Sequence, residues 1–226
     1  VSEGKNSLRS AEPRQEFALT IATHTAQCGS AAEWENGIPQ PAPAIEAARR
    51  TTAWWDDFWN RSWIFVDIPT EQEAKPGVTQ AYALQRWMTA CAGRGRYPIK
   101  FNGSIFTVDP KFAGGPDFNA DWRKWGDCYW WQNTRFPYFA MMARGDFDEC
   151  ESVFRLYREV LPLCEARARL YHNVRGAYFP ETMTIFGTYS NNDYGWNREG
   201  RQPNEVLSPW WQYAWQQGLE LTALML

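Results

Sequence analysis

Helical spacing of apolar residues from about residue 44 onward is the feature that most limits the folds open to this chain. The spacing predicts helices over residues 45–63, 78–93, 128–143 and 147–171, and a final helix that starts near Leu207. Asp146 is predicted to cap the helix that follows it. The stretches 97–121 and 175–205 are rich in Gly, Asn and aromatic residues and are predicted to be long loops. Helical hairpins with such loops at one rim are typical of an (α/α)6 toroid.

The first part of the chain has a different character. Residues 17–25 are β-branched and half-alternating, which predicts a strand, and residues 28–43 form a Gly- and Pro-rich connector. We therefore expect residues 1–27 to end a β-rich domain and residues 28–44 to be a linker. Residues 45–226 are then the amino-terminal part of a mainly α domain.

The last predicted helix indicates that this domain continues. Its apolar stripe needs a neighbour to cover it, and consists of Trp211, Trp215, Leu221 and Met225. The predicted helices are also too few to close a ring of six hairpins. We expect a truncated toroid, in which the remainder of the same polypeptide or another chain covers this stripe.

Charge and motif content argue against several classes of protein. The 226-residue chain has a formal net charge of -3 and no basic run, so nucleic acid is not an expected partner. No apolar stretch approaches the length of a membrane span. The five Cys are scattered, only two His are present, and there is no CxxC, GxSxG, Walker or HExxH motif. We predict no metal site and no cofactor.

The aromatic content favours a carbohydrate ligand. Aromatic residues make up 16% of the chain, which includes 14 Trp. Flat indole faces are suited to the apolar C–H faces of pyranose rings. Packing within the core must nevertheless account for most of these side chains.

Glu181 is the best candidate for a catalytic acid. Glycoside hydrolysis needs one carboxylic acid to protonate the leaving oxygen and a second carboxylate as base or nucleophile. Glu181 follows Tyr178, Phe179 and Pro180 in a predicted loop, an apolar setting that would raise its pKa. The alternative is a surface or helix-capping glutamate.

Other polar residues could line the same site. Asn133 and Arg135 interrupt an otherwise aromatic helix, so they must face something polar. Either they bind a sugar and a water, or they belong to a polar network between helices. Asn102 could bind substrate or form a turn before Gly103. Asp193 resembles a turn residue and is a second-rank candidate for the opposing carboxylate.

Several blocks resemble a known group of proteins. WWDDFWNRS at residues 54–62 resembles the WxxFWxRS helix that opens the catalytic domain in a group of bacterial polysaccharide-degrading proteins. YALQR at 82–86, PIKFNG at 98–103 and WGDCYWWQNTR at 125–135 look like its next blocks. That group is distantly similar to glycoside hydrolase family 95, the inverting α-L-fucosidases and galactosidases with a six-hairpin toroid.

The resemblance implies a fold and a set of site residues. In family 95 a β-sandwich precedes the toroid, which would make residues 1–27 the end of such a sandwich. FPE at 179–181 looks like the block that carries the general acid, and Asn133 matches a water-positioning Asn. Trp131 stands where the family has another Asn. The family's base comes from a later part of the toroid.

The resulting prediction is an inverting, exo-acting glycosidase of oligo- or polysaccharides, periplasmic or secreted as the resemblance implies. Glu181 and Asn133 are assigned to catalysis, and the residues assigned to substrate binding are Asn102, Trp125, Trp131, Arg135, Tyr178 and Asp193. Two alternatives stay open. One is a non-catalytic carbohydrate-binding toroid. The other is a polysaccharide lyase, which needs a Tyr or His base near an Arg, and for which Tyr178, Tyr189 and His172 are available.

Overall fold

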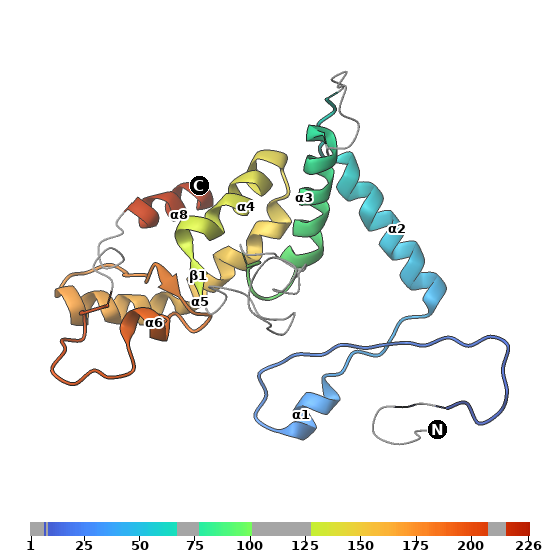
Figure 1. The fold of residues 1–226 in the computed structure, drawn as a ribbon, viewed down its shortest axis with the longest axis horizontal. Coiled ribbons are helices and arrows are strands. Elements are labelled where there is room, and N and C mark those ends of the chain that lie inside the picture. The colour runs from blue at the N-terminus through green and yellow to red at the C-terminus, as the bar shows by residue number, and fades with distance from the viewer. Residues whose placement is uncertain (1–6, 8, 67–76, 101–127, 208–215) are drawn as a thin grey trace, which may run out of the picture. The chain divides into compact units, whose positions relative to one another are not determined.

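The computed structural model describes residues 7, 9–66, 77–100, 128–207 and 216–226, which are mainly helical as predicted (Figure 1). In these residues the helices are α1 (Ala31–Asn36), α2 (Ala44–Asn60), α3 (Val78–Gly93), α4 (Trp131–Arg144), α5 (Phe147–His172), α6 (Asn191–Tyr194) and α8 (Gln216–Met225). Two short strands, β1 (Tyr129–Trp130) and β2 (Thr182–Met183), pair antiparallel. The helix over residues 78–93 is confirmed, and α5 ends one residue later than predicted.

Two predicted helix boundaries are wrong. Residues 128–130 do not begin α4, because Tyr129 and Trp130 pair with β2 and Trp130 has an extended backbone with φ −79° and ψ 106°. The helix predicted over residues 45–63 ends earlier, at Asn60. Leu207 itself is not helical, and its amide donates to the carbonyl of Asp193, while residues 208–215, where the last helix was predicted to begin, lie outside the described residues. Trp211 and Trp215 of the predicted stripe lie outside the described residues. Leu221 of that stripe is buried in the core, whereas Met225 is exposed.

The chain divides into two compact units, and the first comprises residues 1–58. In its described residues no strand forms over 17–25, where Phe17, Leu19 and Ile21 are exposed, so the strand prediction is wrong. The predicted linker instead contains α1, which begins with Ser30: the Ser30 hydroxyl accepts from the amide of Glu33 at 3.2 Å. This pairing of Ser with Glu three residues later is a capping signal that our prediction missed. The proposed domain boundaries stay a prediction.

The second unit, residues 59–226, is organised around the hairpin of α4 and α5. Gly145 ends α4 in the left-handed conformation, with φ 78°, and its amide donates to the carbonyls of Met141 and Met142. Helix α3 packs on α5, and α8 packs on α4 (Figure 1). The core between them is formed mainly by Tyr138 and Met141 of α4, Val153, Leu156, Tyr157 and Cys164 of α5, Met183 of β2, and Leu221 and Leu224 of α8.

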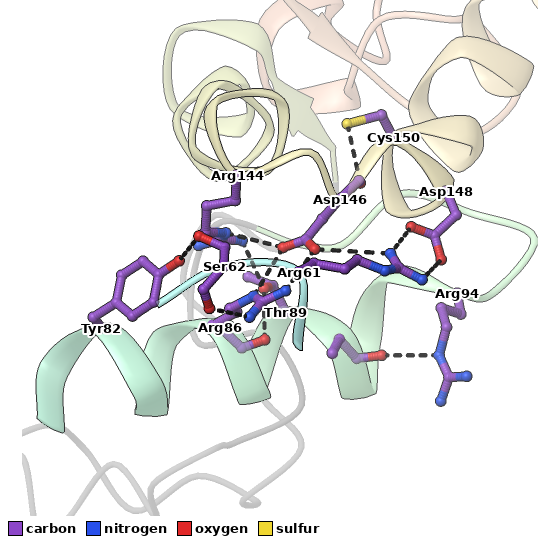
Figure 2. A network of polar contacts seen from close by, with 11 residues as sticks. Arg61, Ser62, Tyr82, Arg86, Thr89, Arg94, Arg144, Asp146, Asp148 and Cys150 are labelled. Carbon is purple, nitrogen blue, oxygen red and sulfur yellow. Dashed lines mark hydrogen bonds and ion pairs between the residues drawn. The ribbon is translucent and has the colours of Figure 1, made fainter. Parts of the chain in front are cut away.

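A buried ionic cluster joins α3 to the turn between α4 and α5 (Figure 2). The Asp146 carboxylate accepts from Arg86 at 2.9 and 3.1 Å and from Arg144 at 3.0 Å, and both Arg86 and Asp146 have no exposed side-chain surface. Arg61 reaches Asp148 at 2.7 Å beside them. Asp146 precedes α5 as predicted but makes no capping bond with its side chain. The guanidinium groups bind its carboxylate instead, because a two-pronged bond between two ionised groups is stronger than a single bond from a neutral amide.

Gly187 fixes the loop that carries β2 against α5. Its φ is 75°, and a Cβ placed there would lie only 2.7 Å from the Cβ of Val160. We expect Gly187→Ala to be more destabilising than Gly200→Ala by about 1–3 kcal/mol, because it adds overpacking to left-handed strain. Gly200 is the matched control, since its φ is 73° and no atom lies within 4 Å of its Cβ position. Urea unfolding of both variants measures the difference, and equal losses would contradict this account.

Candidate functional site

The β1–β2 pairing brings Glu181 to the amino end of α4. Tyr129 pairs with Met183 and Trp130 with Thr182, so residue 181 lies beside residue 131. The Trp131 amide donates to the Glu181 carbonyl at 3.2 Å, and the Gln132 amide donates to Glu181 Oε1 at 2.9 Å. Amides in a first helical turn lack partners within the helix, so a carboxylate there is a stabilising acceptor. Glu181 therefore caps α4, which is one of the two roles considered from the sequence.

The surroundings of Glu181 favour its protonated form near neutral pH. The residue is 2% exposed, and burial raises the pKa of its carboxyl to about 7. The Gln132 amide, the Gln217 side chain and the charge of Arg135 act in the opposite direction, while the charge of Glu220 raises the pKa further. Oε2 has no hydrogen-bond partner among the described residues. One oxygen is thus held by α4, and the other is a buried acceptor without a hydrogen bond in the described residues.

Glu220 of α8 is a second carboxylate at this site. Trp131 Nε1 donates to Glu220 Oε2 at 3.0 Å, and the Arg135 guanidinium binds the same oxygen. Trp131 and Arg135 are four residues apart and share one face of α4. Arg135 therefore belongs to a polar network between helices, the alternative considered for it above. Glu220 was not predicted from the sequence, although it is the one charged residue among residues 216–226.

A cavity of about 430 Å³ lies between the end of α5, the loop that follows it and the start of α8. Aromatic side chains dominate its wall, and the described lining residues include no acidic side chain. They are Trp131, Tyr157, Ala168, His172, Val174, Arg175, Gly176, Ala177, Tyr178, Phe179, Pro180, Gln217, Gly218 and Leu221. Glu181 does not line the cavity, but Trp131 and Gln217 do. The Trp131 amide donates to the Glu181 carbonyl, and the Gln217 side chain lowers the pKa of the Glu181 carboxyl. The carboxyl and the cavity are therefore neighbours.

The other predicted residues have different placements. Asn133 is half-buried in the first turn of α4 and follows Gln132, whose amide binds Glu181. Pro137 inside α4 has no amide hydrogen, so the Asn133 carbonyl lacks its usual helical donor. Asp193 accepts from Ser190 Oγ at 2.7 Å in α6 and does not line the cavity. Asn102 and Trp125 lie outside the described residues.

Tyr178 lines the cavity as part of an aromatic cluster. The Tyr189 hydroxyl donates to the Tyr178 hydroxyl at 2.9 Å, and the His172 ring lies 5.2 Å from the Tyr178 ring in an edge-on arrangement. Arg167 fixes this segment by donating to the carbonyls of Tyr178 and Gly187 at 3.0 and 2.6 Å. His172, Tyr178 and Arg175, the residue types named for a lyase, thus border one cavity.

The described parts of the chain contain no cluster of three or more His, Cys, Asp or Glu that could hold a metal ion. The five Cys are all free thiols, of which Cys128, Cys150 and Cys164 are buried. In the same residues, no helix is long and apolar enough to cross a membrane.

The raised pKa of Glu181 has a consequence for stability. An acid whose pKa rises from 4.5 to about 7 on folding stabilises the protein below pH 4.5, and this contribution is lost as pH rises to about 7. We expect the unfolding free energy of the wild type to fall over this interval relative to that of Glu181→Gln. The slope of the difference should reach about 1.4 kcal/mol per pH unit. Denaturant unfolding at several pH values measures it, and a difference independent of pH would contradict the burial argument.

Comparison with known proteins adds one match. A family model described as "Domain of unknown function (DUF5703)" matches residues 4–64. No curated protein and no solved structure matches the chain. The matched residues cover about the first unit and end before α3, so the candidate site lies outside them. What is established is a mainly α protein with a buried carboxyl next to an aromatic cavity.

Proposed function

We propose that this chain carries part of the active site of a glycoside hydrolase, with Glu181 as general acid. The observation that carries the proposal is the state of this carboxyl: it is buried, its pKa is raised to about 7, and Oε2 has no partner among the described residues. A general acid must hold its proton at working pH and present it to the leaving group. An aromatic cavity that suits a pyranose ring lies beside it.

In this proposal Glu181 Oε2 donates its proton to the glycosidic oxygen as the bond to the anomeric carbon breaks. A second carboxylate activates the attacking water. Within the described residues, Glu220 is a candidate for that role because its charge acts on Glu181, although Trp131 and Arg135 both bind its Oε2. Asp193, which is bonded to Ser190, is the other candidate. Gln217 both lines the cavity and lowers the pKa of Glu181 through its side chain, so it connects the cavity to the carboxyl.

The finer features of the proposal come from the sequence resemblance. An inverting, exo-acting reaction, a periplasmic or secreted location and an (α/α)6 toroid are proposed on that basis. The α4–α5 hairpin and the packing of α3 and α8 on it support the toroid, since such rings are built from helical hairpins.

A polysaccharide lyase is the second candidate, and one observation favours it. His172, Tyr178 and Arg175 border the same cavity. A lyase removes a proton from the carbon next to a uronate carboxylate with a Tyr or His base, while an Arg neutralises the acid. The bond to the leaving sugar then breaks and leaves a carbon–carbon double bond.

The experiment is to incubate the chain with a panel of neutral and acidic glycans and to identify the products. A hydrolase releases a saturated sugar that incorporates water at the anomeric carbon, and inversion is visible by NMR at early times. A lyase instead releases an unsaturated sugar that absorbs in the ultraviolet. Binding without either product would overturn the enzymatic proposal in favour of a non-catalytic carbohydrate-binding toroid.

A further inference from the structure

We infer that the cavity beside Glu181 binds a sugar that carries a carboxylate, a hexuronate, with Arg175 as the residue that recognises the acid. This inference names a substrate class and rests on the proposed carbohydrate function. It depends on two observations, which are the aromatic wall of the cavity and the unbalanced positive charge at its edge.

The wall offers stacking surfaces for a ring. Tyr178 and Phe179 are half-buried and line the cavity, so part of each ring is accessible, whereas Trp131 and Tyr157 pack in the core and are only 2% and 5% exposed. The cavity volume of about 430 Å³ falls within the range of small-ligand sites. Ring faces of this kind pack against the C–H face of a pyranose and leave its rim groups for polar partners.

Arg175 gives the cavity its charge. The described lining residues contain no carboxylate, and Arg175 makes no ion pair or hydrogen bond with the described part of the chain. Several buried or half-buried arginines of this unit have such partners: Arg86 and Arg144 bind Asp146, Arg135 binds Glu220, and Arg167 binds two carbonyls. An exposed guanidinium at the mouth of an apolar cavity is therefore available to an anionic ligand.

The local backbone supports this placement of Arg175. Helix α5 ends at His172 and is capped by Asn173, which has a left-handed backbone with φ 53°, and Gly176 has φ 129°. These two conformations turn the chain back along α5, where the Tyr178 amide donates to the Cys164 carbonyl at 3.0 Å. The turn holds Arg175 at the cavity with His172 and Tyr178, which can bind sugar hydroxyls. A planar guanidinium matches a planar carboxylate with two parallel bonds, which favours a uronate.

The test compares each acid with its own neutral form. Trigalacturonate and a β-1,4-linked triglucuronate are titrated against the full chain by calorimetry, alongside the same trisaccharides after reduction of every carboxyl to the alcohol. We expect at least one acidic trisaccharide to bind about tenfold or more tightly than its reduced form, as a charge-assisted pair predicts. Arg175→Gln should remove this preference and leave binding of the reduced sugar unchanged.

Arg169→Gln is the matched control. Arg169 lies in the last turn of α5, is exposed, and does not line the cavity, so its loss removes the same charge from the same region. Equal affinity of acid and reduced forms for the wild type would overturn the uronate inference. So would an equal loss of preference in both variants, which would indicate general charge attraction. Neither result touches the proposed function, which is decided separately by product analysis. If only the reduced sugars bound tightly, the ligand of the cavity would be a neutral sugar, which would also overturn the uronate inference.

Discussion

Asp146→Asn is expected to lower the free energy of unfolding by about 3–5 kcal/mol, which would be a large part of the stability of a domain of this size. The carboxylate is fully buried and accepts from Arg86 and Arg144, with Arg61 3.8 Å away (Figure 2). Asparagine keeps the shape but removes the charge, so two buried guanidinium groups lose their counter-ion. Urea unfolding followed by circular dichroism measures the effect.

Glu151→Gln is the control for this prediction. Glu151 pairs with Arg155 one turn along α5, but its side chain is 69% exposed, so the expected loss is within about 0.5 kcal/mol. If the two variants lost similar amounts of stability, the cluster around Asp146 would not be the anchor between α3 and the α4–α5 turn.

Glu181→Gln is expected to reduce turnover of a natural glycan by roughly 10²–10⁴, the usual cost of losing a positioned acid. Glutamine is nearly isosteric with a protonated glutamate, and its side-chain oxygen can still accept from the Gln132 amide, so the fold and sugar binding should persist. A nitrophenyl glycoside needs little protonation of its leaving group. Its hydrolysis should therefore lose much less rate than that of the natural glycan.

The comparison of the two substrates separates chemistry from misfolding, because a misfolded variant would lose both activities alike. Glu165→Gln makes the same change on the exposed surface of α5 and should leave both rates unchanged. A Glu181→Gln variant that cleaves the natural glycan near the wild-type rate would remove Glu181 from the role of acid and favour the lyase.

The helices could be predicted from the sequence because their signal is local. Helix α3 was predicted with its observed bounds, since both its apolar period and its Gly ending lie within the helix. The two-residue strands β1 and β2 were missed because so short a run has no period to detect. Their pairing, not any local pattern, shifts the start of α4 from residue 128 to Trp131.

Part of the candidate site could be predicted because its signal is also local in the sequence. The aromatic neighbours of Glu181 in sequence correctly indicated burial and a raised pKa. Glu220 could not be found as its partner, because that neighbourhood arises only when α8 packs on α4. The prediction for Asp146 was wrong in its chemistry, since the distant Arg61 and Arg86, together with the neighbouring Arg144, compete with the helix end for one carboxylate.

The antiparallel register of β1 and β2 also bears on the order in which the protein folds. Tyr129 and Met183 are far apart along the chain, so closing that loop in an unfolded chain would carry a large entropic cost. The α4–α5 hairpin forms from local contacts, and the segment after α5 turns back along it at Tyr178. Strand pairing is therefore expected after the hairpin has formed, which makes burial of the Glu181 carboxyl a late event. Substitutions at Glu181 or Glu220 should then change the rate of unfolding more than the rate of folding.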